Sequence, residues 1–210
     1  MTMVKICGLT NLEDARWAAA CGADLLGFIF VPATPRYVER ETAAAIMRDL
    51  RAEGYRCRFV GVFADAEPDT IRRTVTTCDL DLVQLHGQES PEAVSALGVP
   101  VIRATRVREQ VDWPKLVAWQ SWAYLFDTYD PHRLGGTGHP WRWELLGNRP
   151  PNIERVIVAG GLTPDNVALA IRQAHPWGVD VSSGVEATPG HKNPSQVERF
   201  IRIAKEECEQ

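Results

Sequence analysis

The sequence predicts an α/β fold in which eight parallel strands close into a single (β/α)8 TIM barrel over residues 1–210. Eight short apolar runs alternate with helix-like segments, and this alternation is typical of a parallel sheet covered by helices. The length of 210 residues lies near the short end of the roughly 200 to 400 residues of such barrels. No Ser/Gly-rich linker or change of composition divides the chain, so we expect one domain.

The first apolar run begins the barrel. Val4-Lys5-Ile6-Cys7 is followed by Gly8, so Cys7 is expected to be the last residue of a strand. Thr10-Asn11-Leu12-Glu13 has the Ser/Thr-x-x-Glu form of a capping box, with Thr10 at the cap. A helix is therefore expected from Leu12 to about Cys21, ended by Gly22.

The later elements follow in the same alternation. Strands are expected at Leu25–Phe30, Arg58–Phe63, Leu82–Leu85, Val101–Ala104, Tyr124–Phe126, Val156–Ala159 and Val179–Val181. Helices are expected at Glu41–Glu53, from Pro68, from Ser90-Pro91-Glu92, near Val111–Trp119, between Trp141 and Leu146, from Thr163-Pro164 and from Pro194 to about Glu207. The sixth helix has the weakest pattern, because it must follow the long loop that contains Gly135-Gly136-Thr137-Gly138.

Composition favours a small molecule as partner. The net charge of -4, without a long Lys/Arg run, argues against a nucleic-acid-binding surface. The five cysteines form no C-x-x-C pair, so neither a disulfide framework nor a zinc cluster is predicted, and a reducing cytoplasm fits best. The N-terminus does not have the pattern of a leader, and no apolar run approaches the roughly 20 residues of a membrane span.

In such a barrel the functional side chains come from the C-terminal ends of the strands. Gly160-Gly161 follows strand seven and Ser182-Ser183-Gly184 follows strand eight. Glycine lets backbone N–H groups approach an anion, so Gly160, Gly161, Ser182, Ser183 and Gly184 predict a phosphate site. The alternative is that these glycines only form turns.

Two titratable groups on different strands suggest acid–base chemistry. Cys7 ends strand one and Asp127 ends strand six. A partly desolvated Asp stays protonated to higher pH, and a Cys near a helix start gains thiolate character. From the residues alone, Cys7 fits a buried structural thiol as well, and Asp127 fits a cap or a solvated loop position.

A set of motifs in order along the chain carries a family resemblance. They are Val4-Lys5-Ile6-Cys7-Gly8-Leu9-Thr10, Gly27-Phe28-Ile29-Phe30, Pro35-Arg36-Tyr37-Val38, Val60-Gly61-Val62-Phe63, Val83-Gln84-Leu85-His86-Gly87, Asp127-Thr128 with Gly135-Gly136-Thr137-Gly138, Ala159-Gly160-Gly161-Leu162 with Asn166-Val167, and Val179-Asp180-Val181-Ser182-Ser183-Gly184-Val185-Glu186 with Pro189-Gly190. Together they resemble phosphoribosylanthranilate isomerase of tryptophan biosynthesis.

The resemblance implies an aldose–ketose isomerase that carries out an Amadori rearrangement of N-(5-phosphoribosyl)anthranilate to 1-(2-carboxyphenylamino)-1-deoxyribulose 5-phosphate, without metal or organic cofactor. It implies Asp127 as general acid, Cys7 as general base and Arg36 as the group that binds the anthranilate carboxylate. His86 and Asp180 are expected to line the pocket, and a core or capping role fits either residue about equally well. Lys5 is expected one layer deeper in the barrel, in a structural role. A monomer and a homodimer both remain open.

Three competing hypotheses and two departures accompany this interpretation. The chain is also compatible with a related aminoaldose isomerase of histidine biosynthesis, with a Schiff-base enzyme that uses Lys5, or with a barrel that only binds a metabolite. Trp141-Arg142-Trp143 stands where the family usually has Phe-Asp-Trp, and Asn193 where Asp is usual. Asn193 is still expected to cap the last helix, with Pro194 at its first position.

Overall fold

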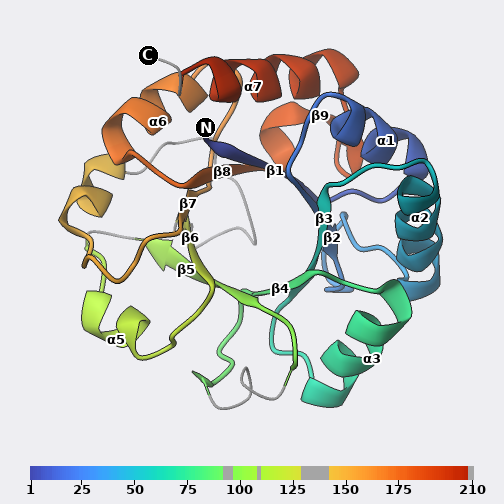
Figure 1. The fold of residues 1–210 in the computed structure, drawn as a ribbon, viewed down its shortest axis with the longest axis horizontal. Coiled ribbons are helices and arrows are strands. Elements are labelled where there is room, and N and C mark those ends of the chain that lie inside the picture. Colours follow the sequence, from blue (N-terminus) through green and yellow to red (C-terminus); the bar gives the residue numbers. More distant parts are fainter. Residues whose placement is uncertain (92–96, 108–109, 129–141, 208–210) are drawn as a thin grey trace.

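Eight parallel strands form a closed barrel in sequence order, and the helices form a ring around it (Figure 1). This computed structural model describes residues 1–91, 97–107, 110–128 and 142–207. The strands are β1 (Met3–Cys7), β2 (Leu25–Ile29), β3 (Arg58–Phe63), β4 (Leu82–Leu85), β5 (Val101–Val107), β6 (Ala123–Thr128), β7 (Val156–Val158) and β8 (Gly178–Val181). Pairing of β1 with β8 closes the barrel, so the predicted fold class is confirmed.

Helices connect successive strands across the outside of the barrel. They are α1 (Leu12–Ala20), α2 (Arg40–Ala52), α3 (Pro68–Cys78), α5 (Trp113–Val117), α6 (Val167–Ala174) and α7 (Pro194–Glu206), with the short 3-10 helices η1 (Trp143–Asn148) and η2 (Ser183–Val185). A two-stranded antiparallel hairpin of β9 (Glu186–Thr188) and β10 (His191–Lys192) follows η2. Most of the expected fourth helix, the loop at Gly135-Gly136-Thr137-Gly138, and Trp141 lie outside the described residues.

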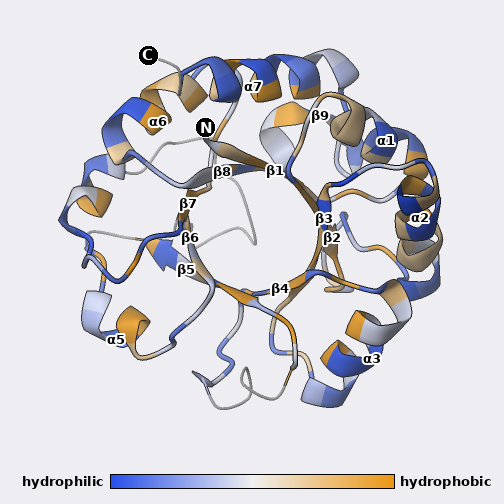
Figure 2. Cartoon of the chain, viewed as in Figure 1, coloured by the Kyte–Doolittle hydropathy of each residue, from blue (hydrophilic) through white to orange (hydrophobic). Residues whose placement is uncertain are grey.

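Apolar side chains fill two separate layers. The larger layer lies between the strands and the helices, where Val4 and Ile6 of β1 contact it. The smaller layer fills the barrel interior with residues from alternate strand positions, such as Leu25, Ile102 and Leu125. Figure 2 shows the strands mostly hydrophobic and the helices with hydrophilic residues on their outer sides. Burial on both faces explains why the strands read as continuous apolar runs in the sequence.

The end of the barrel at the strand N-termini is covered by two tryptophans. Trp122 and Trp177 pack edge to face, with ring centroids 5.2 Å apart, against the interior layer. The guanidinium of Arg155 lies 5.0 Å from the centre of the Trp122 ring. These aromatic residues leave the other end of the barrel, where the strands finish, for the functional side chains.

Several expected helix boundaries were wrong in detail. The cap of α1 is Asn11, whose side chain accepts a hydrogen bond from the Asp14 backbone N–H, whereas the Thr10 hydroxyl donates to the Gly190 carbonyl. Thr10 is thus diverted by a tertiary contact that the local pattern does not encode. Helix α6 begins at Val167, several residues after the expected start at Thr163, because residues 164–166 form a turn.

Other boundaries agree with expectation or differ in length. Pro68 occupies the first turn of α3, and the Asn193 side chain caps α7 by accepting from the Gln196 backbone N–H. Strand β5 runs three residues beyond the expected end, and the following helix α5 is shorter than expected. The sixth connection contains the 3-10 helix η1, in which Trp143 is buried. A short 3-10 helix therefore takes the place of the expected helix, and the buried Trp143 side chain packs it against the core.

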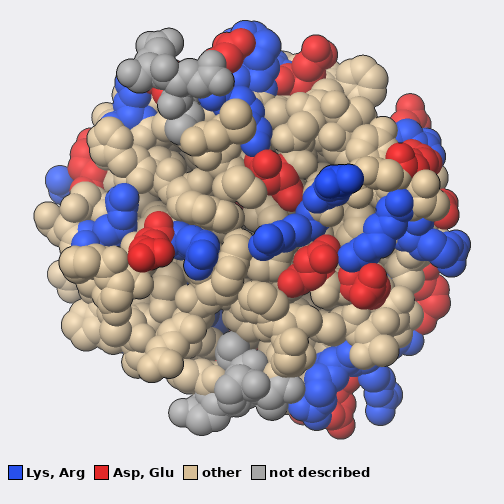
Figure 3. Space-filling view, viewed as in Figure 1, with Lys and Arg blue, Asp and Glu red and all other residues tan. Residues whose placement is uncertain are grey.

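The outer surface carries mixed charge. On the face seen in Figure 3, acidic and basic side chains are interspersed. Within the described ranges, no helix combines the length and the apolar character that crossing a membrane requires.

Candidate active site

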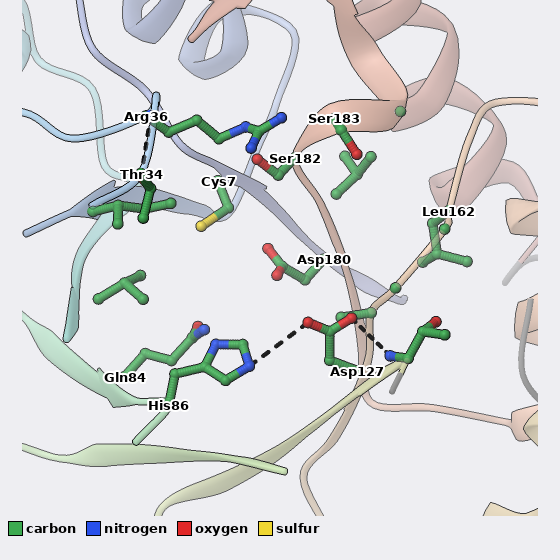
Figure 4. Close-up of a pocket in the computed structure, with 18 of the residues that line it drawn as sticks. Cys7, Thr34, Arg36, Gln84, His86, Asp127, Leu162, Asp180, Ser182 and Ser183 are labelled. Carbon is green, nitrogen blue, oxygen red and sulfur yellow. Dashed lines mark hydrogen bonds and ion pairs between the residues drawn. The ribbon is translucent and has the colours of Figure 1, made fainter. Parts of the chain in front are cut away.

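One cavity at the C-terminal ends of the strands brings together all ten site residues that the sequence predicts. They are Cys7, Arg36, His86, Asp127, Gly160, Gly161, Asp180, Ser182, Ser183 and Gly184. Figure 4 shows the side chains of Cys7, Asp180 and Asp127 directed into the same space. Strands β1 and β6, which carry Cys7 and Asp127, are separated in the barrel by β7 and β8. A substrate bound across the barrel mouth can therefore meet two titratable groups from different sides.

Cys7 is a buried thiol beside a buried ammonium. It is 5% exposed at the end of β1, and Lys5 lies two residues earlier on the same face of the strand. Burial raises the pKa of the Cys7 thiol, and the charge of Lys5 partly opposes that rise. Gly27 of β2 makes room for the thiol, because a Cβ there would lie 2.7 Å from Cys7 Sγ. The surroundings thus raise the pKa of Cys7 on balance, and the positive charges of Lys5 and Lys192 limit that rise.

Lys5 is closer to the chemistry than the sequence suggested. Its Nζ lies 2.9 Å from Oδ1 of Asp180, and both side chains are almost fully buried. Burial by itself lowers the pKa of Lys5, but Asp180 and Cys7 more than offset this, so the pKa stays above its ordinary value. Lys5 therefore remains a cation at neutral pH. It is a charged neighbour of Cys7, and a protonated amine is not a nucleophile for Schiff-base formation.

Asp127 faces the cavity because of strand alternation. Ala123 and Leu125 of β6 belong to the interior layer, and Asp127 is the next residue on that face. Its Oδ1 accepts a hydrogen bond of 2.7 Å from the Thr128 backbone N–H. Burial raises the pKa of Asp127 to about 6, against the lowering effect of that N–H group. The carboxyl group thus keeps a proton at a pH where an exposed Asp has lost it.

His86 is a neutral neighbour of Asp127. It follows β4, and its Nε2 lies 3.6 Å from Oδ2 of Asp127 (Figure 4). Burial lowers the pKa of His86 to about 4, and the positive charge of Arg106 adds to the effect. An uncharged imidazole at this distance forms neither a strong hydrogen bond nor an ion pair with Asp127 at neutral pH. His86 therefore stays available to contact a ligand in the cavity.

The loops after β7 and β8 fit together only with glycine. Gly160 and Gly161 have φ values of 81° and 66°, in the left-handed region that favours glycine. A Cβ on Gly160 would overlap the backbone N and the hydroxyl of Thr128, and a Cβ on Gly184 would overlap the Leu162 carbonyl oxygen. Backbone atoms of both loops consequently border the cavity without side chains between them, and the first N–H groups of η2 have no acceptor within that helix.

Arg36 reaches the cavity from the loop after β2, but a carboxylate of the protein already contacts it. Its Nε and Nη2 donate hydrogen bonds of 2.8 and 2.7 Å to the two carboxylate oxygens of Glu186. Lys192 Nζ approaches the same carboxylate at 3.0 Å. Gly8, with φ of 75°, makes this approach possible, since a Cβ there would lie 2.8 Å from Arg36 Cδ.

Four residues near the cavity were not assigned roles from the sequence. Gln84 and Arg106 line the cavity, and strand alternation would have found them, because Leu82 and Ala104 two residues earlier face the interior. Glu186 was part of a recognised motif, but its contact with Arg36 spans 150 residues of sequence. Lys192 lies in the β9–β10 hairpin, whose pairing no local pattern reveals.

Buried polar atoms without partners surround the cavity. Within the described chain, Gln84 Oε1, His86 Nε2, Thr128 Oγ1 and Ser182 Oγ are buried and make no hydrogen bond. Buried polar atoms are normally paired, so these four atoms are hydrogen-bonding groups that a molecule bound in the cavity can satisfy. Among the same residues, no group of three His, Cys, Asp or Glu side chains is arranged to hold a metal ion.

Comparisons with known proteins agree with one another. The family model described as N-(5'phosphoribosyl)anthranilate (PRA) isomerase matches residues 4–203. The N-(5'-phosphoribosyl)anthranilate isomerase of Pelobacter propionicus is 45% identical over 206 residues, which is 98% of this chain and 97% of that protein.

Solved structures give the same result. The phosphoribosyl anthranilate isomerase of Thermotoga maritima has a TM-score of 0.91 at 38% identity, over 98% of this chain and 100% of that one. A phosphoribosyl anthranilate isomerase in complex with reduced 1-(o-carboxyphenylamino)-1-deoxyribulose 5-phosphate has a TM-score of 0.86 at 36% identity, over 98% and 100% of the two chains.

Proposed function

Since this chain belongs to the N-(5'-phosphoribosyl)anthranilate isomerase family, we propose that it converts N-(5-phosphoribosyl)anthranilate to 1-(2-carboxyphenylamino)-1-deoxyribulose 5-phosphate in tryptophan biosynthesis. The observation that carries this proposal is the single cavity in which Cys7, Asp127, Arg36 and both glycine loops meet. Each of these groups matches one chemical part of the substrate. The catalytic roles given below are part of the proposal.

The phosphate group is held by the loops after β7 and β8. Backbone N–H groups of Gly160, Gly161, Ser183 and Gly184, together with the Ser182 hydroxyl, supply donors to the phosphate oxygens. Loops seven and eight are the usual phosphate site of this fold. The ribose then extends across the barrel mouth toward Gln84 and the strands opposite.

The anthranilate ring lies on the other side of the cavity. Ile29, Val31, Val62 and Ala64 line that side and offer apolar contact to an aromatic ring. Arg36, on the loop after β2, binds the ring carboxylate through N–H groups that Glu186 does not use. Substrate orientation therefore follows from an anion site at each end of the cavity and an apolar wall between them.

Asp127 acts as the general acid. Its raised pKa of about 6 keeps a fraction of the carboxyl protonated near neutral pH. It donates this proton to the ribose ring oxygen as the C1–O bond breaks, and the anthranilate nitrogen supplies the electron pair that forms the C1–N iminium. The Asp127 carboxylate left behind is stabilised by the Thr128 N–H.

Cys7 acts as the general base. Its thiolate, held beside the Lys5 cation, removes the proton from C2, and the C2–H electron pair forms the enolamine as the iminium is neutralised. Tautomerisation of the enolamine then gives the C2 ketone. Atoms and electrons balance within the substrate, so no oxidant, reductant or cofactor enters these proposed steps.

Other assignments extend this proposal. Cytoplasmic location is supported by the absence of disulfides at Cys7, Cys21, Cys57 and Cys78.

The Schiff-base alternative loses support from the Lys5–Asp180 ion pair, and no relative named above supports the histidine-pathway alternative. Monomeric and homodimeric forms both fit the proposal, because all the groups it uses come from one chain.

Loss of anthranilate-type fluorescence on mixing purified protein with freshly prepared N-(5-phosphoribosyl)anthranilate tests the proposed reaction. We expect saturable turnover to a product of unchanged mass, with no added metal and with activity retained in a chelator. The carboxyl-free analogue N-(5-phosphoribosyl)aniline serves as a substrate control and should be used with a higher KM. A protein that binds the substrate without turnover would contradict the proposal and leave only a binding barrel.

A further inference from the structure

Arg36 is one of three charged residues that form a continuous ion-pair network at the edge of the cavity. Glu186 of β9 binds Arg36 through both carboxylate oxygens, at 2.7 and 2.8 Å. Lys192 of β10 binds Oε1 of the same carboxylate at 3.0 Å. The side chains of Glu186 and Lys192 are 5% and 1% exposed, whereas that of Arg36 is 18% exposed. Glu186 and Lys192 are therefore buried, and Arg36 is the member of the network that a ligand can reach.

The contact geometry leaves part of the Arg36 guanidinium free. Glu186 takes the edge formed by Nε and Nη2. Nη1 makes no hydrogen bond to any other residue in the described ranges, so the Nη1–Nη2 edge is the one that remains for a ligand. A planar guanidinium with one edge fixed in a two-bond contact presents its second edge in a fixed direction.

Charge balance explains why Lys192 is present. A carboxylate beside Arg36 cancels the charge that should attract a substrate carboxylate, so Arg36 and Glu186 alone form a neutral pair. Burial acts to raise the pKa of Glu186, but Arg36 and Lys192 hold it below its ordinary value, so Glu186 is ionised. Burial lowers the pKa of Lys192, and the Glu186 carboxylate opposes that shift. With a protonated Lys192 included, the three side chains carry a net charge of about +1 in a region of low dielectric.

The same lysine also contacts the phosphate side of the cavity. Lys192 Nζ donates a hydrogen bond of 3.1 Å to the backbone carbonyl of Ser182, in the loop after β8. One buried ammonium thus joins the loop proposed for phosphate to the carboxylate behind Arg36. No other cation contacts Glu186 besides Arg36 and Lys192 in the described part of the chain.

We propose that Glu186 and Lys192 are positioning residues for recognition of the substrate carboxylate, with Glu186 fixing the plane of Arg36 and Lys192 neutralising Glu186 so that Arg36 keeps a net attraction for an anion. This inference rests on the proposed function. Neither residue belongs to the proposed acid–base pair, and both act on substrate binding through Arg36. The Lys192 cation has a second, smaller effect, because it lowers the pKa of Cys7. Lys192 consequently contributes to recognition of the substrate carboxylate, although its side chain is buried.

The net charge of the network can be changed and then restored by substitution, and a purely structural role for Lys192 would not make KM follow that charge. Lys192→Met leaves a neutral Arg36–Glu186 pair, and we expect KM for N-(5-phosphoribosyl)anthranilate to rise about tenfold. We expect a smaller fall in kcat, because Lys192 also lowers the pKa of Cys7. Adding Glu186→Gln restores the net positive charge, so the double variant should return KM to within about threefold of wild type. Lys205→Met, which removes a lysine paired with Asp24 away from the cavity, is the matched control and should leave KM unchanged.

The analogue N-(5-phosphoribosyl)aniline separates carboxylate recognition from the phosphate loop. Because this analogue lacks the carboxylate, Lys192→Met should leave its KM within about twofold of the wild-type value. An equal rise of KM for both substrates would overturn the inference, since it would place the effect at Ser182. A double variant as impaired as Lys192→Met, while folded by circular dichroism, would also overturn it.

Wild type, Lys192→Met and the double variant together distinguish a folding defect, a failure of the proposed function and a failure of this inference. If Lys192→Met fails to fold, the double variant is compared with wild type on both substrates, and a KM raised more than about threefold for N-(5-phosphoribosyl)anthranilate would overturn the inference. Wild-type protein without turnover would overturn the proposed function and this inference together. Active wild type with an unchanged KM in Lys192→Met would overturn this inference alone.

Discussion

At the residue scale, the cavity places titratable side chains where burial and a neighbouring charge act against each other. Burial raises the pKa of Cys7 and of Asp127, which favours the neutral form of both. Lys5 and the Thr128 N–H oppose these shifts at Cys7 and Asp127 respectively. Asp127 therefore keeps a proton to higher pH than an exposed Asp, and the Lys5 cation limits the rise in the pKa of Cys7.

Replacing Asp127 should increase the free energy of unfolding while removing activity. The folded-state pKa of about 6 exceeds the ordinary 3.8, so the folded protein binds this proton more tightly, and stability is lost as pH rises from about 4 to about 6. Asp127→Asn removes this titration and keeps an oxygen that accepts from Thr128. We expect it to be about 1–3 kcal/mol more stable than wild type at pH 8.

Urea unfolding at pH 5 and pH 8 measures this difference. The advantage of Asp127→Asn should be larger at pH 8 than at pH 5, where part of the native Asp127 is protonated. The exposed substitution Asp69→Asn on α3 is the matched control for removing a carboxylate far from the cavity. An Asp127→Asn variant less stable than wild type at pH 8 would contradict the assigned environment of this carboxyl group.

The sequence predicts which residues lie at the site but not which residues contact one another there. Cys7 and Asp127 could be found because a residue at the end of a parallel strand faces the functional end of a barrel. Glu186 could not be assigned to Arg36, and Lys5 could not be placed against Asp180, because these contacts join residues 150 and 175 positions apart. Such pairings depend on barrel closure and hairpin geometry, which local patterns do not contain.

At the element scale, the position of each functional group follows from strand periodicity. Leu82, Ala104 and Leu125 fill the barrel interior, and side chains on the same face two residues farther along enter the cavity or extend the filled layer. Apolar runs bounded by Gly or Pro located the strands well. Helix starts were less predictable, since the Thr10 hydroxyl is used by Gly190 and Asn11 becomes the cap.

The fit between the loops after β7 and β8 predicts a sensitive glycine. Gly184→Ala places a Cβ on the Leu162 carbonyl oxygen, so the two loops must separate. We expect KM for N-(5-phosphoribosyl)anthranilate to rise at least about tenfold through weaker phosphate binding. The inhibition constant of inorganic phosphate, measured as a competitive inhibitor, should rise by a similar factor.

Gly147→Ala in η1 is the matched control, because a Cβ there meets nothing within 4 Å. It should leave KM and phosphate inhibition unchanged. Wild-type phosphate inhibition in a folded Gly184→Ala variant would show that these loops do not hold the phosphate.

At the scale of the whole molecule, the two ends of the barrel have different tasks. Trp122 and Trp177 cover one end of the interior layer, whereas polar and titratable groups collect at the other. Composition and alternation were sufficient to predict the closed barrel, since eight units of this length have few other arrangements. One domain over residues 1–210 stays a prediction.

The proposed mechanism requires both opposed groups of this cavity to act in the same reaction. Each is expected to contribute about 10² to 10⁴ in rate as a general acid or base. Their removal should lower kcat without a comparable change in phosphate inhibition, because neither residue lies in the loops after β7 and β8.

The most direct test is kcat of Cys7→Ala and Asp127→Ala beside the matched controls Cys57→Ala, a half-buried free thiol outside the cavity, and Asp69→Asn. We predict a loss of at least about 10² in kcat for each cavity variant and wild-type values for both controls. Activity that persists in either folded cavity variant would contradict the assignment of Cys7 and Asp127 as base and acid.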